Sequence, residues 1–90
     1  SDVYKNPFNP LNEKTKVDFQ FPELTPLTIR IFNIMGHEVK TINNRIYQPG
    51  KHHFIWDGKN NNYSIVPSGV YFISVNSKFD HIVKKVVVRN

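Results

Sequence analysis

Serine, histidine and aspartate side chains are the candidates for catalysis in this chain, because a nucleophile needs a base within hydrogen-bond reach. None of the serines has the Gly-x-Ser-x-Gly context that exposes a nucleophilic hydroxyl; they stand in turn or strand contexts at Ser64, Ser68, Ser74 and Ser77. Asp57 precedes Gly58, a context in which the carboxylate typically accepts hydrogen bonds from the loop backbone. The sequence therefore predicts no catalytic residue, and the domain itself is not expected to be an enzyme.

Histidines are the main candidates for binding a transition metal, because the chain contains no cysteine. His52 and His53 are neighbours in a predicted strand, so their side chains point to opposite faces and do not converge on one ion. His37 and His81 are isolated in the sequence. No transition-metal site is predicted.

The segment that starts at Asp57 resembles a calcium-binding loop only in part. Asp57, Asn60 and Asn62 offer oxygen ligands, but the sixth and twelfth positions hold Asn62 and Ser68, where the motif requires Gly and a bidentate Glu. We expect a polar turn here, and no metal or other cofactor in the domain.

Aromatic residues offer a possible carbohydrate-binding surface, provided that several of them are exposed on one face. The candidates are Trp56, Tyr63, Tyr71 and Phe72. A domain this small needs large aromatic side chains in its core, and Trp56 lies on an alternating strand. We therefore expect Trp56 to be buried.

The length and composition of the chain fit one small folded domain. Ninety residues, 39% of them hydrophobic and 21% charged, are enough for a single compact core. We expect one domain over residues 1–90. No apolar run approaches the ~20 residues of a membrane span, and Ser1–Tyr4 lacks the basic and apolar order of a secretory signal.

The formal net charge of +5 raises the question of an anionic partner such as nucleic acid. Lysines and arginines are scattered along the chain and gather only at Lys84, Lys85 and Arg89, inside a β-branched run. We therefore expect no nucleic-acid partner and assign the charge to solubility.

Alternation of apolar and polar residues predicts a series of short strands. They span residues 16–21, 27–34, 37–42, 51–56, 70–76 and 79–88. Turn signals separate them at Pro22 to Pro26, Gly36, Asn43-Asn44, Pro49-Gly50 and Pro67 to Gly69, and the differing parity of Val39 and Ile42 predicts a bulge. With no helical periodicity, this pattern predicts an all-β protein, an antiparallel Ig-like sandwich of six or seven strands.

Five blocks of residues then stand out by their order. Asn6-Pro7-Phe8-Asn9-Pro10 precedes the first strand, and the others are Ile31–Val39, Trp56-Asp57-Gly58, Pro67-Ser68-Gly69-Val70-Tyr71-Phe72 and Lys84–Arg89. In this order and spacing they resemble the Ig-like C-terminal sorting domains of cargo proteins of the bacterial type IX secretion system, which are related to the Ig-like domain of the flagellar hook-capping protein. The resemblance extends from about Val3 to the end of the chain.

The resemblance implies a C-terminal module of a larger secreted protein. Such cargo crosses the inner membrane by a separate N-terminal signal, is recognised in the periplasm of a Gram-negative-type bacterium and passes through the outer membrane. The implied partners are the outer-membrane translocation and sorting machinery and an upstream cargo domain, and the implied location is secreted or at the cell surface. The alternative is a structural, interaction or spacer Ig-like module of an extracellular protein, for example beside a hydrolase.

The closing strand is the candidate recognition element. In the family the end of the chain carries much of the signal, which points here to Val83, Lys84, Lys85, Val86, Val87, Val88 and Arg89. A terminal β-branched strand can pair with a receptor strand, with its two lysines setting register and discouraging self-association. The same residues also fit a purely structural strand with gatekeeper lysines, and the two interpretations stay open at this point.

Overall fold

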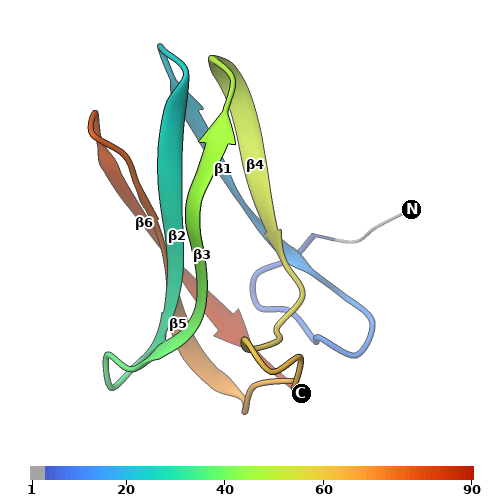
Figure 1. Ribbon diagram of the computed structural model, residues 1–90. Helices are drawn as coiled ribbons and strands as arrows, with labels where there is room; N and C mark the ends of the chain where they lie inside the picture. The colour runs from blue at the N-terminus through green and yellow to red at the C-terminus, as the bar shows by residue number, and fades with distance from the viewer. Residues whose placement is uncertain (1–3) are drawn as a thin grey trace.

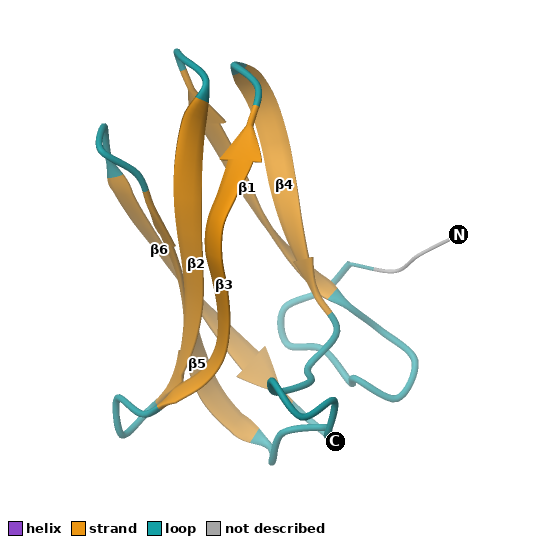
Figure 2. Cartoon of the chain, viewed as in Figure 1, coloured by secondary structure: helices purple, strands orange, loops and turns teal. Residues whose placement is uncertain are grey.

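The computed structural model describes residues 4–90, which form two antiparallel sheets with no helix in that range (Figures 1 and 2). The predicted all-β sandwich is confirmed, with the lower of the two expected strand numbers. The six strands are β1 (Thr15–Phe21), β2 (Thr25–Asn33), β3 (Glu38–Tyr47), β4 (Gly50–Trp56), β5 (Gly69–Asn76) and β6 (His81–Val88).

The larger sheet has the order β3-β2-β5-β6, and the smaller sheet pairs β1 with β4. All pairs are antiparallel. β6 therefore lies at one edge of the larger sheet, and β5 is its only neighbouring strand. The β5–β6 pairing runs without a register shift from Gly69↔Val88 to Asn76↔His81, so the side chains of β6 alternate regularly between the core and the outside.

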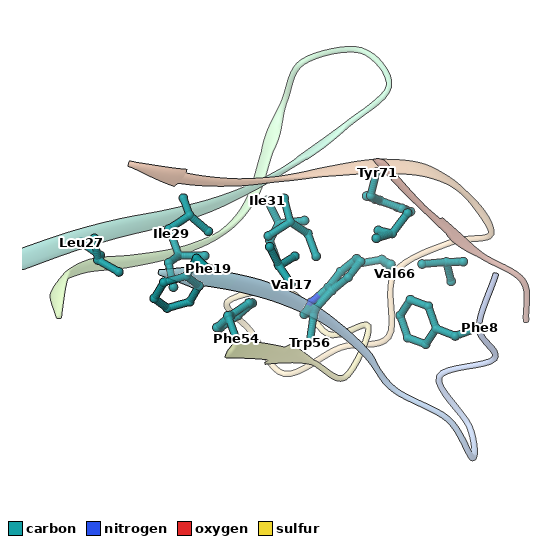
Figure 3. Packing of buried hydrophobic residues seen from close by; sticks show 14 of the residues in the cluster. Phe8, Val17, Phe19, Leu27, Ile29, Ile31, Phe54, Trp56, Val66 and Tyr71 are labelled. Atoms are coloured by element: carbon teal, nitrogen blue, oxygen red, sulfur yellow. The ribbon is translucent and has the colours of Figure 1, made fainter. Parts of the chain in front are cut away.

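The core lies between the two sheets, because each strand turns its apolar alternate residues inward. β1 and β4 contribute Val17, Phe19, Phe21, Phe54 and Trp56, and they face β2, β5 and β6, which contribute Leu27, Ile29, Ile31, Tyr71, Ile73, Val75, Val86 and Val88. Figure 3 shows Trp56 within this cluster, with Leu27 toward one end and Phe8 at the other. The predicted burial of Trp56 is confirmed, since its exposed fraction is 0%.

β3 extends beyond the strand predicted over residues 37–42, because Asn43-Asn44 do not form the predicted turn. Both asparagines lie within β3, which stays paired to β2 as far as Tyr47, opposite Thr25. Asn44 has a φ of +49°, a conformation that Asn tolerates better than most residues. The predicted bulge is confirmed: Ile31 pairs with Lys40 and Phe32 with Glu38, which leaves Val39 as the extra residue.

Pro26 also lies within a strand, although its sequence context predicted a strand end. It sits in β2 opposite Ile46 of β3, whereas the pairing of β2 with β5 reaches only to Thr28. Pro26 therefore has a neighbouring strand on one side only, and proline is tolerated at such edge positions because its missing N–H breaks no ladder bond.

The last strand starts two residues later than predicted. Ser77 to Asp80 form the β5–β6 connection, in which the Ser77 hydroxyl accepts hydrogen bonds from the backbone N–H groups of Phe79 (2.9 Å) and Asp80 (3.1 Å). In the part of the chain that the structure describes, no helix is long and apolar enough to cross a membrane.

Candidate functional site: the C-terminal strand and the segment that closes its edge

The side chains of β6 divide into two sets. Val86 and Val88 point into the core and are 0% and 1% exposed, whereas Val83 points outward and is 53% exposed. Lys85 is exposed, and Val87 is half-buried on the same outer side. Of the residues predicted for recognition, Val83 and Lys85 on β6 and Arg89 just after it are therefore accessible, and Val86 and Val88 are not.

The two lysines of β6 do different things. Lys84 is directed toward the other sheet, where its ammonium donates a hydrogen bond of 2.9 Å to the backbone carbonyl of Lys16 in β1. Lys85 stands on the outer face, opposite Phe72 of β5 in the register. Lys84 thus links the two sheets at the edge of the sandwich, and Lys85 is free to contact another molecule.

The free edge of β6 is covered in part by Asn6–Phe8, which we call the edge segment. The Asn6 side chain donates to the carbonyl of Lys85 and accepts from the N–H of Val87, both at 2.9 Å. Phe8 continues the pairing: its N–H donates to the carbonyl of Val87 at 3.0 Å, and its carbonyl accepts from the N–H of Arg89 at 2.9 Å. The edge segment therefore replaces a parallel neighbour strand along the end of β6.

Phe8 anchors the edge segment in the core. Its side chain is 1% exposed, and its ring meets Trp56 edge to face, with ring centroids 5.7 Å apart. Trp56 in turn meets Tyr71 edge to face at 5.4 Å, and the Trp56 indole N–H donates to the carbonyl of Lys59 at 3.0 Å. Aromatic pairs in this geometry are favourable beyond their buried area.

Gly58 is required by this packing. Its φ is +79°, and a Cβ at this position would lie 2.6 Å from the Cβ of Pro10 and 3.3 Å from the ring of Phe8. The neighbouring Asp57 carboxylate accepts a hydrogen bond from the N–H of Lys59 at 3.0 Å, which confirms its predicted part in the loop. We call the five packed residues Phe8, Pro10, Trp56, Gly58 and Tyr71 the motif cluster.

Tyr71 connects the fourth sequence block, Pro67 to Phe72, to the motif cluster. Its hydroxyl donates to the carbonyl of Pro67 at 2.7 Å, a bond to the upstream backbone like that of the tyrosine corner in Ig-like sandwiches. Burial disfavours the charged phenolate and raises the pKa of Tyr71. Its neighbours Val70 and Phe72 are half-buried on the opposite, outer face.

The last residue is tethered beside this cluster. The backbone N–H of Asn90 donates to the Ser68 hydroxyl at 2.9 Å, and its side-chain amide donates to the carbonyl of Val66 at 3.0 Å. Val66 is buried and donates its own N–H to the carbonyl of Gly58 at 2.9 Å. The end of the chain is thus held by the loop that connects β4 to β5.

Asn9 shapes the turn that follows the edge segment. Its side chain accepts from the N–H of Leu11 at 3.0 Å, and its own N–H donates to the Glu13 carboxylate at 2.8 Å. That bond, together with the ammonium of Lys5 at 3.3 Å, keeps the pKa of Glu13 below its usual value. The first sequence block is therefore an ordered part of the domain.

Comparison with known proteins identifies this arrangement. The family model described as the secretion system C-terminal sorting domain matches residues 6–89. The chain belongs to this family. It is a C-terminal sorting domain of the type IX secretion system, and the resemblance read from the sequence is confirmed. No curated protein matches the chain.

Solved structures show the same fold. FlgD from P. aeruginosa matches with a TM-score of 0.65 and 22% identity, over 83% of this chain and 59% of that one. Truncated FlgD from Helicobacter pylori matches with a TM-score of 0.60 and 27% identity, over 82% and 58% of the two chains. PorZ from Porphyromonas gingivalis, a surface component of the type IX secretion system, matches with a TM-score of 0.60 and 17% identity. The match covers 98% of this chain and 11% of PorZ, so the sorting domain spans only part of these relatives.

The sorting domain closes its opposite sheet edge with a second asparagine, which the sequence did not indicate. The N–H of Asn61 donates to the carbonyl of Val39, and the Asn61 side chain accepts from the N–H of Thr41, both at 3.1 Å. Asn6 lies before β1 and Asn61 lies in the β4–β5 loop, and each bonds the outer edge of a strand. Neither contact could be found by local pattern, because Asn6 lies 79 residues from Lys85 and Asn61 lies 20 residues from Thr41.

The chemical candidates of the sequence are placed as follows. Ser74 and His81 are brought together, with 3.2 Å between the hydroxyl and Nε2, but the Ser74 residue is only 4% exposed. His52 is half-buried and its ring stacks on Phe19, whereas His53 is exposed on the other face of β4. Within residues 4–90 no three His, Asp or Glu side chains gather in a way that could hold a metal ion.

The aromatic candidates for sugar binding do not share a face. Trp56 and Tyr71 are buried in the motif cluster, Phe72 is half-buried on the outer face of the larger sheet, and Tyr63 is 82% exposed in the β4–β5 loop. The described surface of the sorting domain therefore offers no platform of several aromatic rings from this set.

Proposed function

We propose that the sorting machinery of the outer membrane recognises this domain through β6, while the domain itself carries out no chemistry. On this proposal the attached cargo enters the periplasm by its own inner-membrane signal. The folded sorting domain then presents β6 to a protein of the translocation apparatus, and the cargo leaves the cell or stays at its surface.

The observation that supports this proposal most strongly is the position of β6 in the sheet. β6 is an edge strand, and its outer side presents the exposed Val83 and Lys85. Edge strands are the usual sites at which one protein adds a strand to another. The family match adds that the domain is a sorting signal, so an accessible edge near its C-terminal end is the natural surface for recognition.

Delivery of a reporter tests the sorting function. Residues 1–90 would be fused behind a folded periplasmic reporter with its own inner-membrane signal, in a host with an active type IX system and in the same host with its translocation apparatus inactivated. We expect the reporter at the surface of the first host and in the periplasm of the second. Periplasmic retention of an intact, folded fusion in the first host would contradict the function and favour a spacer module.

A charge reversal on β6 tests the recognition element. Deletion of the strand is unsuitable, because Val86 and Val88 are core residues and the edge segment pairs with their neighbours. Lys85→Glu changes an exposed side chain on β6, and Lys51→Glu makes the same change at an exposed position of β4. We expect Lys85→Glu to reduce surface delivery and Lys51→Glu to leave it unchanged, with equal circular dichroism. Equal delivery by both variants would contradict recognition through Lys85.

A further inference from the structure

The edge of β6 is closed along only part of its length. In an antiparallel strand the N–H and C=O of one residue point to the same side, and this side alternates along the chain. The outward groups of Lys85, Val87 and Arg89 bond the edge segment. Because the register with β5 has no shift, the backbone groups of His81 and Val83 point outward as well.

Lys5, the residue just before the edge segment, does not extend this cover. The N–H of Lys5 donates to the carbonyl of Lys14 at 2.8 Å, just before β1, so the chain turns away from β6 there. The N–H of His81 is occupied by the Asp80 carboxylate at 2.7 Å. Within residues 4–90, no hydrogen bond is made by the outward C=O of His81 and Val83 or by the N–H of Val83 and Lys85. We call this stretch, His81–Lys85, the open edge.

The closed part of the edge is poorly suited to a partner strand. Pairing there would displace four hydrogen bonds and withdraw Phe8 from its place against Trp56. The N–H groups of Val83 and Lys85 and the C=O groups of His81 and Val83 have no hydrogen-bond partner within residues 4–90, so a strand that pairs with them breaks no hydrogen bond of the domain. In Figure 1 the β5–β6 connection, where the open edge begins, stands at the left margin of the molecule.

We infer that the open edge His81–Lys85 is a docking site for one extended strand of a protein of the sorting machinery. The inference rests on the proposed function and narrows it to these residues. The added strand would pair with the two donors and two acceptors of the open edge, and the edge segment would set the point where pairing stops.

The outer side chains of the open edge indicate the chemistry of the partner strand. Val83 is apolar and 53% exposed, and Lys85 is a cation two residues further along the same face. Cross-strand neighbours are favourable when apolar residues face apolar ones and opposite charges face each other. The partner strand should therefore carry an apolar or β-branched residue beside Val83 and a carboxylate beside Lys85.

Proline substitution tests the inference at the level of single backbone groups. Val83→Pro removes the outward N–H of Val83 and no bond to β5, because that N–H does not point to β5. Val83→Thr keeps the N–H and the β-branched shape. In the reporter fusion we expect Val83→Pro to lower surface delivery by up to about tenfold, the effect of losing one backbone hydrogen bond in the complex, and Val83→Thr to deliver like the wild type.

A second pair of variants tests the inference if Val83→Pro does not fold. Lys85→Pro removes the other outward N–H and leaves the Lys85 carbonyl for Asn6, and Lys85→Gln is its control for the lost charge. In addition, amide hydrogen exchange of the wild-type domain should be faster at Val83 and Lys85 than at Val87 and Arg89. Equal protection at all four amides would overturn the open edge itself.

The outcomes separate the inference from the proposed function. A wild-type fusion that is not delivered contradicts the proposed function. A delivered wild type with equal delivery by a folded Val83→Pro overturns the inference alone. If the isolated wild-type domain dimerises, Val83→Pro does not and delivery is unchanged, the open edge belongs to a second copy of this domain and the inference is overturned.

Discussion

The two halves of β6 both contain β-branched residues but have different environments. From Lys85 onward, Val86 and Val88 are buried and the backbone edge is paired with Asn6–Phe8. From His81 to Lys85, Val83 is largely exposed, and two N–H and two C=O groups of the backbone edge have no hydrogen-bond partner within residues 4–90. The comparison shows that one strand can be fixed in the fold at one end and leave backbone groups unpaired at the other, and we propose that the unpaired end is the binding edge.

The largest expected effect of a substitution on the closed half comes from Phe8. Phe8→Ala leaves a cavity beside Trp56 and removes the anchor of the edge segment, which should lower the free energy of unfolding by about 3–5 kcal/mol. Val83→Thr, on the open half, should change it by less than about 0.5 kcal/mol. Urea unfolding followed by Trp56 fluorescence measures both. A loss below about 1 kcal/mol for Phe8→Ala would contradict the role of Phe8 as an anchor.

The next largest loss of stability is expected for Gly58→Ala, and Gly36→Ala is its matched control. Both have positive φ, +79° and +83°, but a Cβ at Gly58 meets Pro10 and Phe8, whereas a Cβ at Gly36 meets nothing within 4 Å. Gly36→Ala should lower the free energy of unfolding by about 1 kcal/mol, because of the backbone conformation alone. Gly58→Ala should lower it by about 2–3 kcal/mol, because the new Cβ also clashes with Pro10 and Phe8. Equal losses in thermal unfolding would mean that the close packing of Gly58 is unimportant.

The two asparagines that close opposite sheet edges can be compared directly. Asn6→Ala leaves the Lys85 carbonyl and the Val87 N–H without their partner, and we expect a loss of about 1–2 kcal/mol in the free energy of unfolding. Asn61→Ala removes one side-chain bond, from the Thr41 N–H, and should cost about half as much. Faster exchange of the Val87 amide in Asn6→Ala checks the assignment. An unchanged exchange rate of the Val87 amide would show that the Asn6 side chain does not protect it.

The smallest expected effect is a dependence of stability on alkaline pH. Burial raises the pKa of Tyr71 in the folded state, so the unfolded chain loses this proton first, near pH 10. The contribution of the protonated Tyr71 phenol to the free energy of unfolding is fully present below that pH, and it is lost as the pH rises through the folded-state pKa. Tyr71→Phe should cost about 1 kcal/mol at neutral pH, from the bond to Pro67, and should show a shallower alkaline decline. Parallel alkaline profiles of wild type and variant would contradict this.

Most of the fold was predictable from sequence, because strand alternation and turn residues are local signals. Such patterns predicted the burial of Trp56, the bulge near Val39 and the positive φ of Gly36. Asn43-Asn44 and Pro26 misled the prediction because tertiary pairing with a neighbouring strand outweighed their turn propensity.

The candidate site was predictable only in part. The sequence blocks pointed to the closing strand, whose role in recognition stays a prediction. Alternation alone could not show that Lys84 bonds Lys16 across the sandwich or that Asn6 bonds the edge of β6. Both contacts join residues that are 68 or more positions apart. They depend on which strand lies at the edge, and that is a property of the topology.

The most direct test of this account is the surface-to-periplasm ratio of the reporter fused to two variants, Asn6→Ala and Val83→Pro, measured in one host with an active type IX system. The account predicts that Asn6→Ala, although less stable, is delivered like the wild type, and that Val83→Pro, although folded, is delivered up to about tenfold less. Delivery of a folded Val83→Pro at the wild-type level, or retention of a folded Asn6→Ala, would contradict the division of β6 into a structural half and a recognition half.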